Sequence, residues 1–380
     1  MPDQLTGPDT GPDTGPDTGP GRATAGEPLA PPTARSMTLS ISALVALLLF
    51  AALAFVPVPY AIGSPGPTQD TLGKQGKTPL IAIADKRTYK STGQLRLTTV
   101  SFAGGPGYPV TLPLVIRAWF SPSRIVSPVE TVFPSDRSQH ELDVENHAEM
   151  ISSQENATVA ALEELGYTVP AKLRVAGAVK GTGAAGIVRK DDVVVALDGK
   201  PVTSYTDLVK NLERIKPGQK VSLGIERDGV RRDVNVVTGK RKGGGSQLGV
   251  LIDPSFTLPV KVKIQIEDIG GPSAGNMFAL GIIDKLTPAD EANGKVIAGT
   301  GTMDVDGTVG PIGGIRLKLA GAVRDGATWF IAPAGNCNEV VGHIPAKLHV
   351  VKVSNLHESR EAMIAIGAGK GSTLPTCTAS

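Results

Sequence analysis

The chain alternates between segments with distinct hydrophobic patterns, and the first is an uninterrupted apolar run. No charged residue stands between Met37 and Val58. About 20 apolar residues at roughly 1.5 Å each are enough to cross the hydrocarbon core of a bilayer. A cleaved signal peptide and a buried core helix are the competing interpretations, although a signal core is shorter and lies nearer the N-terminus. We expect a retained transmembrane helix over residues 37–58.

The segment before this run has almost no large apolar side chains. Gly-Pro-Asp-Thr occurs three times in succession from Gly7 to Thr18. Proline at every fourth position blocks helix and ladder hydrogen bonds, and little apolar area offsets the ordering entropy. We therefore predict a disordered tail over residues 1–36. Arg35 flanks the apolar run, whereas the far side is uncharged until Asp70. The positive-inside rule then puts the tail in the cytoplasm and the bulk of the chain outside the cell, anchored in the cell membrane.

After the run, Pro- and Gly-rich residues 59–78 are expected to form a linker. Apolar clusters at 80–84, 95–100 and 114–120 predict strands. Between 145 and 165 the apolar spacing becomes helical. Residues 166–242 then alternate between strand-like and helical patterns and include a hairpin that turns at Asp228-Gly229. The mixture predicts an α+β protein with a separate small module.

Composition excludes several function classes. Lys and Arg (38) nearly balance Asp and Glu (36), and aromatic residues make up 4% of the chain. A nucleic-acid binder needs a basic surplus and stacking platforms, so no nucleic-acid partner is expected. Two cysteines cannot form a structural zinc site, and no His-x-x-x-His pair occurs. We expect no metal and no cofactor.

Two glycine motifs resemble nucleotide-binding loops without their required context. Gly181-x-Gly183-x-x-Gly186 precedes a β-branched strand, whereas a dinucleotide fingerprint opens a helix. Gly76-Lys77-Thr78 lacks the first glycine of a phosphate loop, because Thr71 occupies that position. No nucleotide partner is predicted.

The strongest candidate for chemistry is a glycine-rich turn that leads from a strand-like segment, 260–266, into a helix. Its residues are Gly271, Pro272, Ser273, Ala274 and Gly275. Ser273 is expected at the helix start, where backbone amides and the helix dipole can stabilise an oxyanion. A plain helix cap is the alternative interpretation.

A nucleophilic serine needs a base, and Lys318 is the candidate. It lies in a predicted helix beside an apolar stripe of Ile315, Leu319 and Ala322. Burial there would lower the pKa of its amine towards that of a useful base. A surface lysine whose stem covers apolar neighbours is the alternative.

Together these motifs resemble the proteolytic domain of Lon-type serine proteases. Gly271–Gly275 matches the family's nucleophile motif, and Thr300-Gly301 followed by Pro311-Ile312-Gly313-Gly314 and Lys318 matches its second motif. The resemblance implies that Ser273 is the nucleophile, Lys318 the general base and Thr300 a supporting hydroxyl. The chain departs from the family at Gly270, where Asp is usual, and at Thr302, where Glu is usual.

Residues 184–202 resemble a PDZ domain of the bacterial exported-protease type. Such domains bind peptide ends by adding a strand to a sheet edge. We place the carboxylate loop near Gly166 and Tyr167; a small spacer module without a ligand is the alternative. Residues 93–100 and 149–157 resemble a hairpin and a helix that precede the nucleophile in Lon proteases. The resemblance therefore implies a protease domain in two parts, 79–165 and 243–369, with PDZ module 166–242 inserted and a tail at 370–380.

This combination is similar to the membrane-anchored, PDZ-containing Lon-like proteases of Gram-positive bacteria. It implies an ATP-independent, membrane-tethered serine endopeptidase whose substrates are extended or unfolded envelope and membrane polypeptides. An inactive membrane-anchored PDZ scaffold is the alternative. Rings formed by Lon relatives raise the option of a homo-oligomer. In an extracellular compartment the two cysteines, Cys337 and Cys377, are expected to form a disulfide.

Overall fold

The computed structural model describes residues 33–105, 107–241, 245–266 and 269–378. Residues 1–32 of the predicted tail lie outside this set. Helix α1 (Ala34–Leu53) begins at Thr33, whose hydroxyl accepts a hydrogen bond from the Ser36 amide. The helix ends earlier than the predicted residue 58, and prolines at 57 and 59 cannot continue it. Among the described helices, α1 alone is long and apolar enough to span a bilayer.

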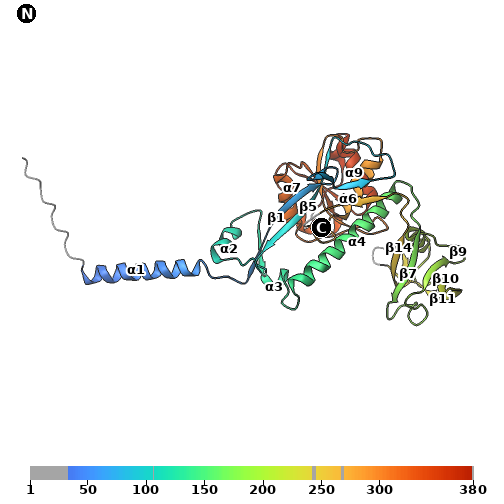
Figure 1. The fold of residues 1–380 in the computed structure, drawn as a ribbon, viewed down its shortest axis with the longest axis horizontal. Helices are drawn as coiled ribbons and strands as arrows, with labels where there is room; N and C mark the ends of the chain where they lie inside the picture. The colour runs from blue at the N-terminus through green and yellow to red at the C-terminus, as the bar shows by residue number, and fades with distance from the viewer. Residues whose placement is uncertain (1–32, 106, 242–244, 267–268, 379–380) are drawn as a thin grey trace, which may run out of the picture. The chain divides into compact units, whose positions relative to one another are not determined.

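Residues from Val56 onward form a separate compact unit built on two main sheets. The larger sheet has the order β20-β19-β16-β5-β1-β6, with parallel pairing from β20 to β5 and antiparallel pairing from β5 to β6. Figure 1 shows two of its strands, β1 and β5, side by side. Its strands are β1 (Tyr60–Asp70), β5 (Gln94–Ala103), β6 (Ile125–Pro128), β16 (Val296–Gly299), β19 (Trp329–Pro333) and β20 (His349–Val353).

The smaller sheet is antiparallel and has the order β11-β10-β8-β7-β14, with β9 paired to β8. Its strands are β7 (Ala171–Ala178), β8 (Val193–Leu197), β9 (Lys200–Pro201), β10 (Lys220–Arg227), β11 (Val230–Val237) and β14 (Val250–Phe256). Helix α5 (Tyr205–Glu213) packs into the core of this sheet through Leu208 and Leu212. The sheet therefore has its own hydrophobic core, and β14 is an edge strand within the described residues.

Short elements complete the fold. The paired ones are β2 (Lys74–Gln75) with β3 (Thr78–Pro79), β4 (Ile81–Ile83) with β15 (Val262–Ile264), β12 (Gly239–Lys240) with β13 (Ser246–Gln247), and β17 (Thr302–Met303) with β18 (Val309–Gly310). The remaining helices are α2 (Leu112–Trp119), α3 (Val129–Val132), α4 (Gln139–Glu164), α6 (Gly275–Leu286), α7 (Ile315–Arg324), α8 (Cys337–Val340), α9 (Leu356–Gly367) and two 3₁₀ turns, Ala334–Asn336 and Gly371–Thr373.

Helix α6 is the centre of the main core. Its residues from Gly275 to Asp284 are all buried, and it packs against α4, α9 and β5. The apolar cluster around α6 includes residues that precede the smaller sheet in the sequence, such as Leu95 and Ala157. It also includes residues that follow that sheet, such as Phe278 and Ile297. Residues 80–165 and 262–366 therefore share one core, as a two-part domain requires.

The linker predicted at 59–78 is wrong, because residues 60–70 form β1 in the main sheet. The glycines and prolines there have structural roles that composition cannot distinguish from a linker. The pairing of β1 with β5 shifts register between Pro65 and Thr68. At Gly63 an added Cβ would lie 2.8 Å from Phe102 Cε1 and 2.9 Å from Leu317 Cδ1, so a larger residue there would have to displace both side chains.

The strand predicted at 114–120 is also wrong, because these residues belong to helix α2. Thr111 precedes the helix and Pro113 lies in its first turn, where a missing amide hydrogen has no cost. Val115 and Ala118, three residues apart, are its buried positions. The short apolar run fits a strand and a helix equally well, and packing against Ile62 and Val110 selects the helix.

The structure also differs from the prediction at the end of the smaller module and at the C-terminal tail. Strand β14 pairs with β7, so the smaller module continues to Phe256 and not to 242. The predicted tail at 370–380 is held in place as far as Cys377, which forms a disulfide with Cys337. The Lys352 amide donates to the Pro375 carbonyl at 3.0 Å, and Leu374 packs on the main core.

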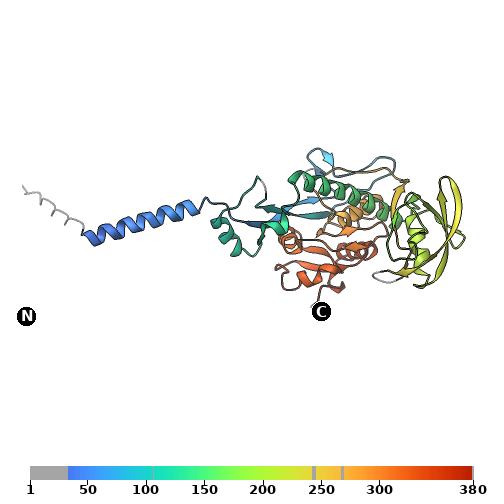
Figure 2. The same ribbon diagram turned by 90° about the horizontal axis from the view of Figure 1, so that it is seen from below.

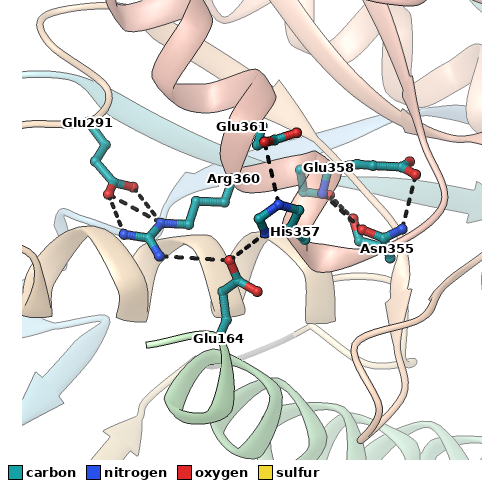
Figure 3. Close-up of polar contacts among 8 residues, drawn as sticks. Glu164, Glu291, Asn355, His357, Glu358, Arg360 and Glu361 are labelled. Atoms are coloured by element: carbon teal, nitrogen blue, oxygen red, sulfur yellow. Dashed lines mark hydrogen bonds and ion pairs between the residues drawn. The ribbon is translucent and has the colours of Figure 1, made fainter. Parts of the chain in front are cut away.

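A polar cluster holds the end of α4, where the chain passes to the smaller module (Figures 1 and 2). Glu164 contacts His357 Nδ1 at 2.9 Å and Arg360 at 3.7 Å, and Arg360 also pairs with the buried carboxylate of Glu291 at 2.8 Å (Figure 3). The Glu164 carboxylate raises the pKa of the His357 imidazole. The N-terminus of α9, capped by Asn355, is thereby fixed to α4.

Cys337 and Cys377 form a disulfide that closes a loop with a sequence separation of 40. Cys377 is buried in an apolar cluster with Ile315 and Leu319 of α7. The bridge therefore attaches the C-terminal segment to the layer that supports α7.

Replacing both cysteines with serine should lower the free energy of unfolding by about 3–4 kcal/mol, because the open loop regains chain entropy in the unfolded state. Denaturant titration of the two proteins under oxidising conditions measures this difference. With reductant added, the wild type should match the variant. Equal stability under oxidising conditions would contradict the prediction.

Candidate active site

Ser273 lies at the end of a tight turn that leads into α6. The residue that caps the helix is Ala274, which has no side-chain capping bond, so Ser273 does not serve as the cap. Its hydroxyl oxygen instead lies at hydrogen-bond distance, 2.7 Å, from Lys318 Nζ. The turn thus leaves the serine side chain available for chemistry.

Helix α4 holds this turn from behind. Ser153 Oγ donates to the Pro272 carbonyl at 2.9 Å, and the Gly271 amide donates to the Asn146 carbonyl at 2.9 Å. Gly271 has a φ of 81°, which favours glycine. At Gly270 an added Cβ would lie 2.8 Å from Asn146 Cβ. Contact with α4 therefore explains why glycine occupies the position before the motif.

Lys318 approaches the same point from α7. The helix starts after Gly314 and packs on β1 and β5, and the Lys318 side chain is only 2% exposed. Besides Ser273, Nζ contacts the Thr98 carbonyl at 3.0 Å and Thr300 Oγ1 at 3.0 Å. Three oxygens therefore surround the amine, and none of them belongs to a carboxylate.

The hydrogen-bond pattern defines what the amine can do. The Thr98 carbonyl can only accept, and the Thr300 hydroxyl donates its hydrogen to the Ser273 carbonyl at 2.9 Å. Both must therefore accept from Lys318. A neutral amine has two hydrogens and one lone pair, so its lone pair remains for the Ser273 hydroxyl. After proton transfer, the ammonium finds three acceptors in the same places.

Burial lowers the pKa of Lys318 from its usual 10.5 to about 7. Desolvation penalises the charged form, and no neighbouring carboxylate opposes it. A substantial neutral fraction at neutral pH is the condition for a lysine base.

Comparison with known proteins assigns both modules. Residues 262–365 match the family "Lon protease (S16) C-terminal proteolytic domain" and residues 156–238 match a PDZ domain family. The chain carries a Lon-type proteolytic domain and a PDZ domain. The α+β class with these two domains is therefore confirmed, and the Lon-type domain is that of a serine peptidase.

Individual relatives agree with this assignment. The chain is 35% identical to a Lon protease of Desulfatibacillum aliphaticivorans over 29% of its own length and 14% of the relative's. It is 26% identical to a Lon protease of Helicobacter pylori over 50% of its length and 20% of the relative's. A probable periplasmic serine endoprotease, DegP-like, of Pseudomonas fulva is 37% identical over 20% of this chain and 16% of the relative. The chain thus matches at most one fifth of these relatives' lengths.

The residues predicted for the Lon-type site lie together. Ser273, Thr300 and Lys318 are in mutual contact, and Gly271, Pro272, Ala274 and Gly275 form the surrounding turn and helix start. A cleft of about 310 Å³ opens at this point. Its lining residues are Pro67, Thr98, Thr99, Val100, Ser101, Met150, Ile269, Gly270, Pro272, Ser273, Ala274, Gly313 and Lys318.

Three supporting groups were not predicted as part of the site. The Thr98 contact uses a backbone carbonyl, which carries no residue-specific signal. Ser153 lies within the segment that resembles the family's helix, and that match could have indicated it. Asn336 is buried, and its side-chain amide holds both the amide and the carbonyl of Ile312, ahead of α7, at 2.9 and 2.8 Å.

The predicted peptide-binding residues Gly166 and Tyr167 lie elsewhere, at the end of α4, where Tyr167 packs beneath Lys86. A different cleft, of about 330 Å³, runs between α5 and β14. Its lining residues are Val179, Thr182, Tyr205, Leu208, Val209, Leu212, Arg241, Ser246, Gln247, Leu248, Gly249, Val250, Leu251 and Ile252. An edge strand beside an apolar helix face is the geometry that accepts an added peptide strand.

The buried amine makes stability depend on pH. Between pH 7 and 10.5 the unfolded chain binds a proton at Lys318 that the folded chain has released, so folding becomes more favourable as pH rises. We predict that the unfolding free energy of the wild type rises relative to that of Lys318→Met across this range. Denaturant titrations at several pH values measure it. Lys370→Met, at an exposed site, provides the control, and parallel curves for wild type and Lys318→Met would contradict the prediction.

Proposed function

We propose that this protein is an ATP-independent, membrane-tethered serine endopeptidase that cleaves extended polypeptides with Ser273 as nucleophile and Lys318 as general base. The observation that carries the proposal is the buried Lys318 amine, 2.7 Å from Ser273 Oγ, with its two other contacts acting as acceptors. This arrangement leaves the lone pair of a neutral amine directed at the serine hydroxyl.

The reaction follows from these contacts. Ser273 Oγ attacks the substrate carbonyl carbon while its proton passes to Lys318 Nζ. The oxyanion forms near the N-terminus of α6, where backbone amides and the helix dipole favour negative charge. When the C–N bond breaks, the ammonium gives its proton to the leaving amine and an ester on Ser273 remains. Water then attacks the ester with Lys318 again as base, and Ser273 regains its hydrogen.

Thr300 and Thr98 have complementary roles in this mechanism. Their oxygens accept hydrogen bonds from Nζ in both protonation states, so the transient buried charge is never without partners. Thr300 also donates to the carbonyl of Ser273 itself, which fixes the backbone of the nucleophile. We assign both as supporting groups.

We assign the cleft between α5 and β14 as the peptide-binding site of the PDZ domain. The free edge of β14 offers backbone hydrogen bonds, and Leu208 and Val209 offer an apolar wall. Insertion of this domain between α4 and β15 of the protease domain would raise the local concentration of a captured chain at Ser273. Extended or unfolded envelope and membrane polypeptides are the substrates that suit both sites.

Tethering and ATP independence rest on separate observations. Helix α1 has the length and composition of a membrane span, and Arg35 near its start favours a cytoplasmic N-terminus with the catalytic unit outside.

Gly76-Lys77-Thr78 lies at a turn between β2 and β3 and not before a helix. The glycines at 181–186 likewise precede a turn and β8. Neither motif has the structural context of a nucleotide loop.

The catalytic assignment predicts that Ser273→Ala and Lys318→Ala each lose at least about 10³-fold in kcat/KM on an unstructured polypeptide. Cleavage is measured with the full chain in proteoliposomes, without ATP. Lys370→Ala should cleave like the wild type, and added ATP should change nothing. Retained cleavage by both dyad variants would contradict the assignment, and inactivity of the wild type would favour a scaffold.

The PDZ assignment predicts that Val209→Lys, which places a charge in the cleft, raises KM for a long polypeptide by about tenfold or more. Cleavage of a short peptide that reaches only the Ser273 cleft should remain unchanged. Val230→Lys is the matched control, because Val230 is 54% exposed on the hairpin of the same domain. An unchanged KM for the polypeptide would exclude this cleft as a substrate site.

A further inference from the structure

Helix α2 presents apolar side chains on its exposed surface. Leu112, Ile116, Trp119 and Phe120 are 38%, 43%, 60% and 85% exposed. Their spacing of four, three and one residues places them along one stripe of a helix with about 3.6 residues per turn. A surface helix ordinarily exposes polar residues, but Arg117 is the only charged residue between Leu112 and Phe120.

This stripe is distinct from the side of α2 that the protein covers. Val115 and Ala118 are buried and pack with Ile62 and Val110. Trp119 also meets the ring of Tyr60 edge-on, with 6.3 Å between ring centroids. The helix is therefore fixed to the start of β1 through Val115 and Ala118 and through the edge of the Trp119 ring. The other residues of the apolar stripe, Leu112, Ile116 and Phe120, are not part of that core.

Chain connectivity keeps this helix near the end of α1. The Val58 amide donates to the Val110 carbonyl at 3.0 Å, and Pro57 forms a β-bridge with Thr111, immediately before α2. Helix α1 ends at Leu53, so four residue steps separate this end from Pro57. When extended, these steps span about 14 Å. This limit holds for any orientation of α1 relative to the rest of the chain.

A membrane-spanning α1 would therefore leave α2 within reach of the bilayer interface. That interface is about 5–8 Å deep on each side of the hydrocarbon core. Trp and Tyr rings favour this zone, and an apolar helix face is buried there. Tyr108, which is 76% exposed and lies shortly before α2, adds a second aromatic side chain suited to the interface.

We propose that the apolar stripe of α2 docks into the lipid interface and gives the catalytic unit a second attachment to the membrane. This inference rests on the proposed tethering through α1. Lipid is the occupant that the short connection to α1 supports, since it places the stripe beside a bilayer. A second copy of the chain would have to cover the same stripe within this restricted zone.

Depth-dependent fluorescence quenching tests the proposal with the full chain in proteoliposomes. The chain has two tryptophans, so Trp329→Phe leaves Trp119 as the sole reporter. Lipids brominated near the headgroup end of the acyl chain should quench Trp119 severalfold. Trp119→Phe is the matched control, because Trp329 is half-buried in the main sheet and stacks on His349 at 4.7 Å. Its emission should change little.

Further measurements separate the outcomes. Carbonate extraction checks the anchor alone: if the protein leaves the vesicles, the tethering proposal fails, and the docking proposal fails with it. Retention of the protein with unquenched Trp119 overturns docking and leaves tethering intact. Quenching should not depend on the protein-to-lipid ratio. Quenching that develops only on dilution would show that a second copy covers the stripe, and would overturn lipid docking. Ile116→Asp, which spares Val115 and Ala118, should reduce the quenching.

Discussion

The proposed chemistry depends on keeping one amine out of water without giving it a counter-ion. Lys318 is buried between α7, β5 and the turn before α6, and burial is the cause of its lowered pKa. A carboxylate in contact with Nζ would stabilise the ammonium and remove the lone pair that the proposed role of Ser273 as nucleophile requires. The site surrounds the amine with a carbonyl and two hydroxyls. These uncharged groups form hydrogen bonds with the amine in both of its protonation states.

The surrounding fold holds three separate segments around this amine. Strand β16 ends at Gly299, opposite Leu97 on β5, and the next residue of β5, Thr98, contributes the carbonyl that meets Nζ. Helix α4 fixes the serine turn through Ser153. On the other side, Asn336 holds the segment before α7, and the neighbouring Cys337 is linked to Cys377. Helix α4 and the C-terminal segment thus support the candidate active site.

Motifs with a direct chemical requirement were predictable from the sequence. Ser273, Thr300 and Lys318 lie together because the two motifs specify a turn, a strand end and a helix. The Lon-type fold brings these three elements together. Segments whose structure depends on packing against residues distant in the sequence were not predictable. The glycines of β1 resemble a linker because the close approach of Phe102 and Leu317 to Gly63 is not visible in the order of the sequence. Helix α2 was misassigned because its exposed face is apolar, which removes the helical periodicity. The cleft between α5 and β14 was not predicted, because β14 follows its module in sequence across a segment that carries no strand signal.

The ionisation of the Lys318 amine is the most direct test of this account. NMR titration of protein labelled at the lysine side chains, with the resonance assigned by comparison with Lys318→Met, gives the pKa of that amine alone. If Lys318 is the base, the midpoint lies at about 7. A midpoint near the usual lysine value of about 10.5 would mean that the amine is charged at neutral pH and would contradict its role as the base for Ser273.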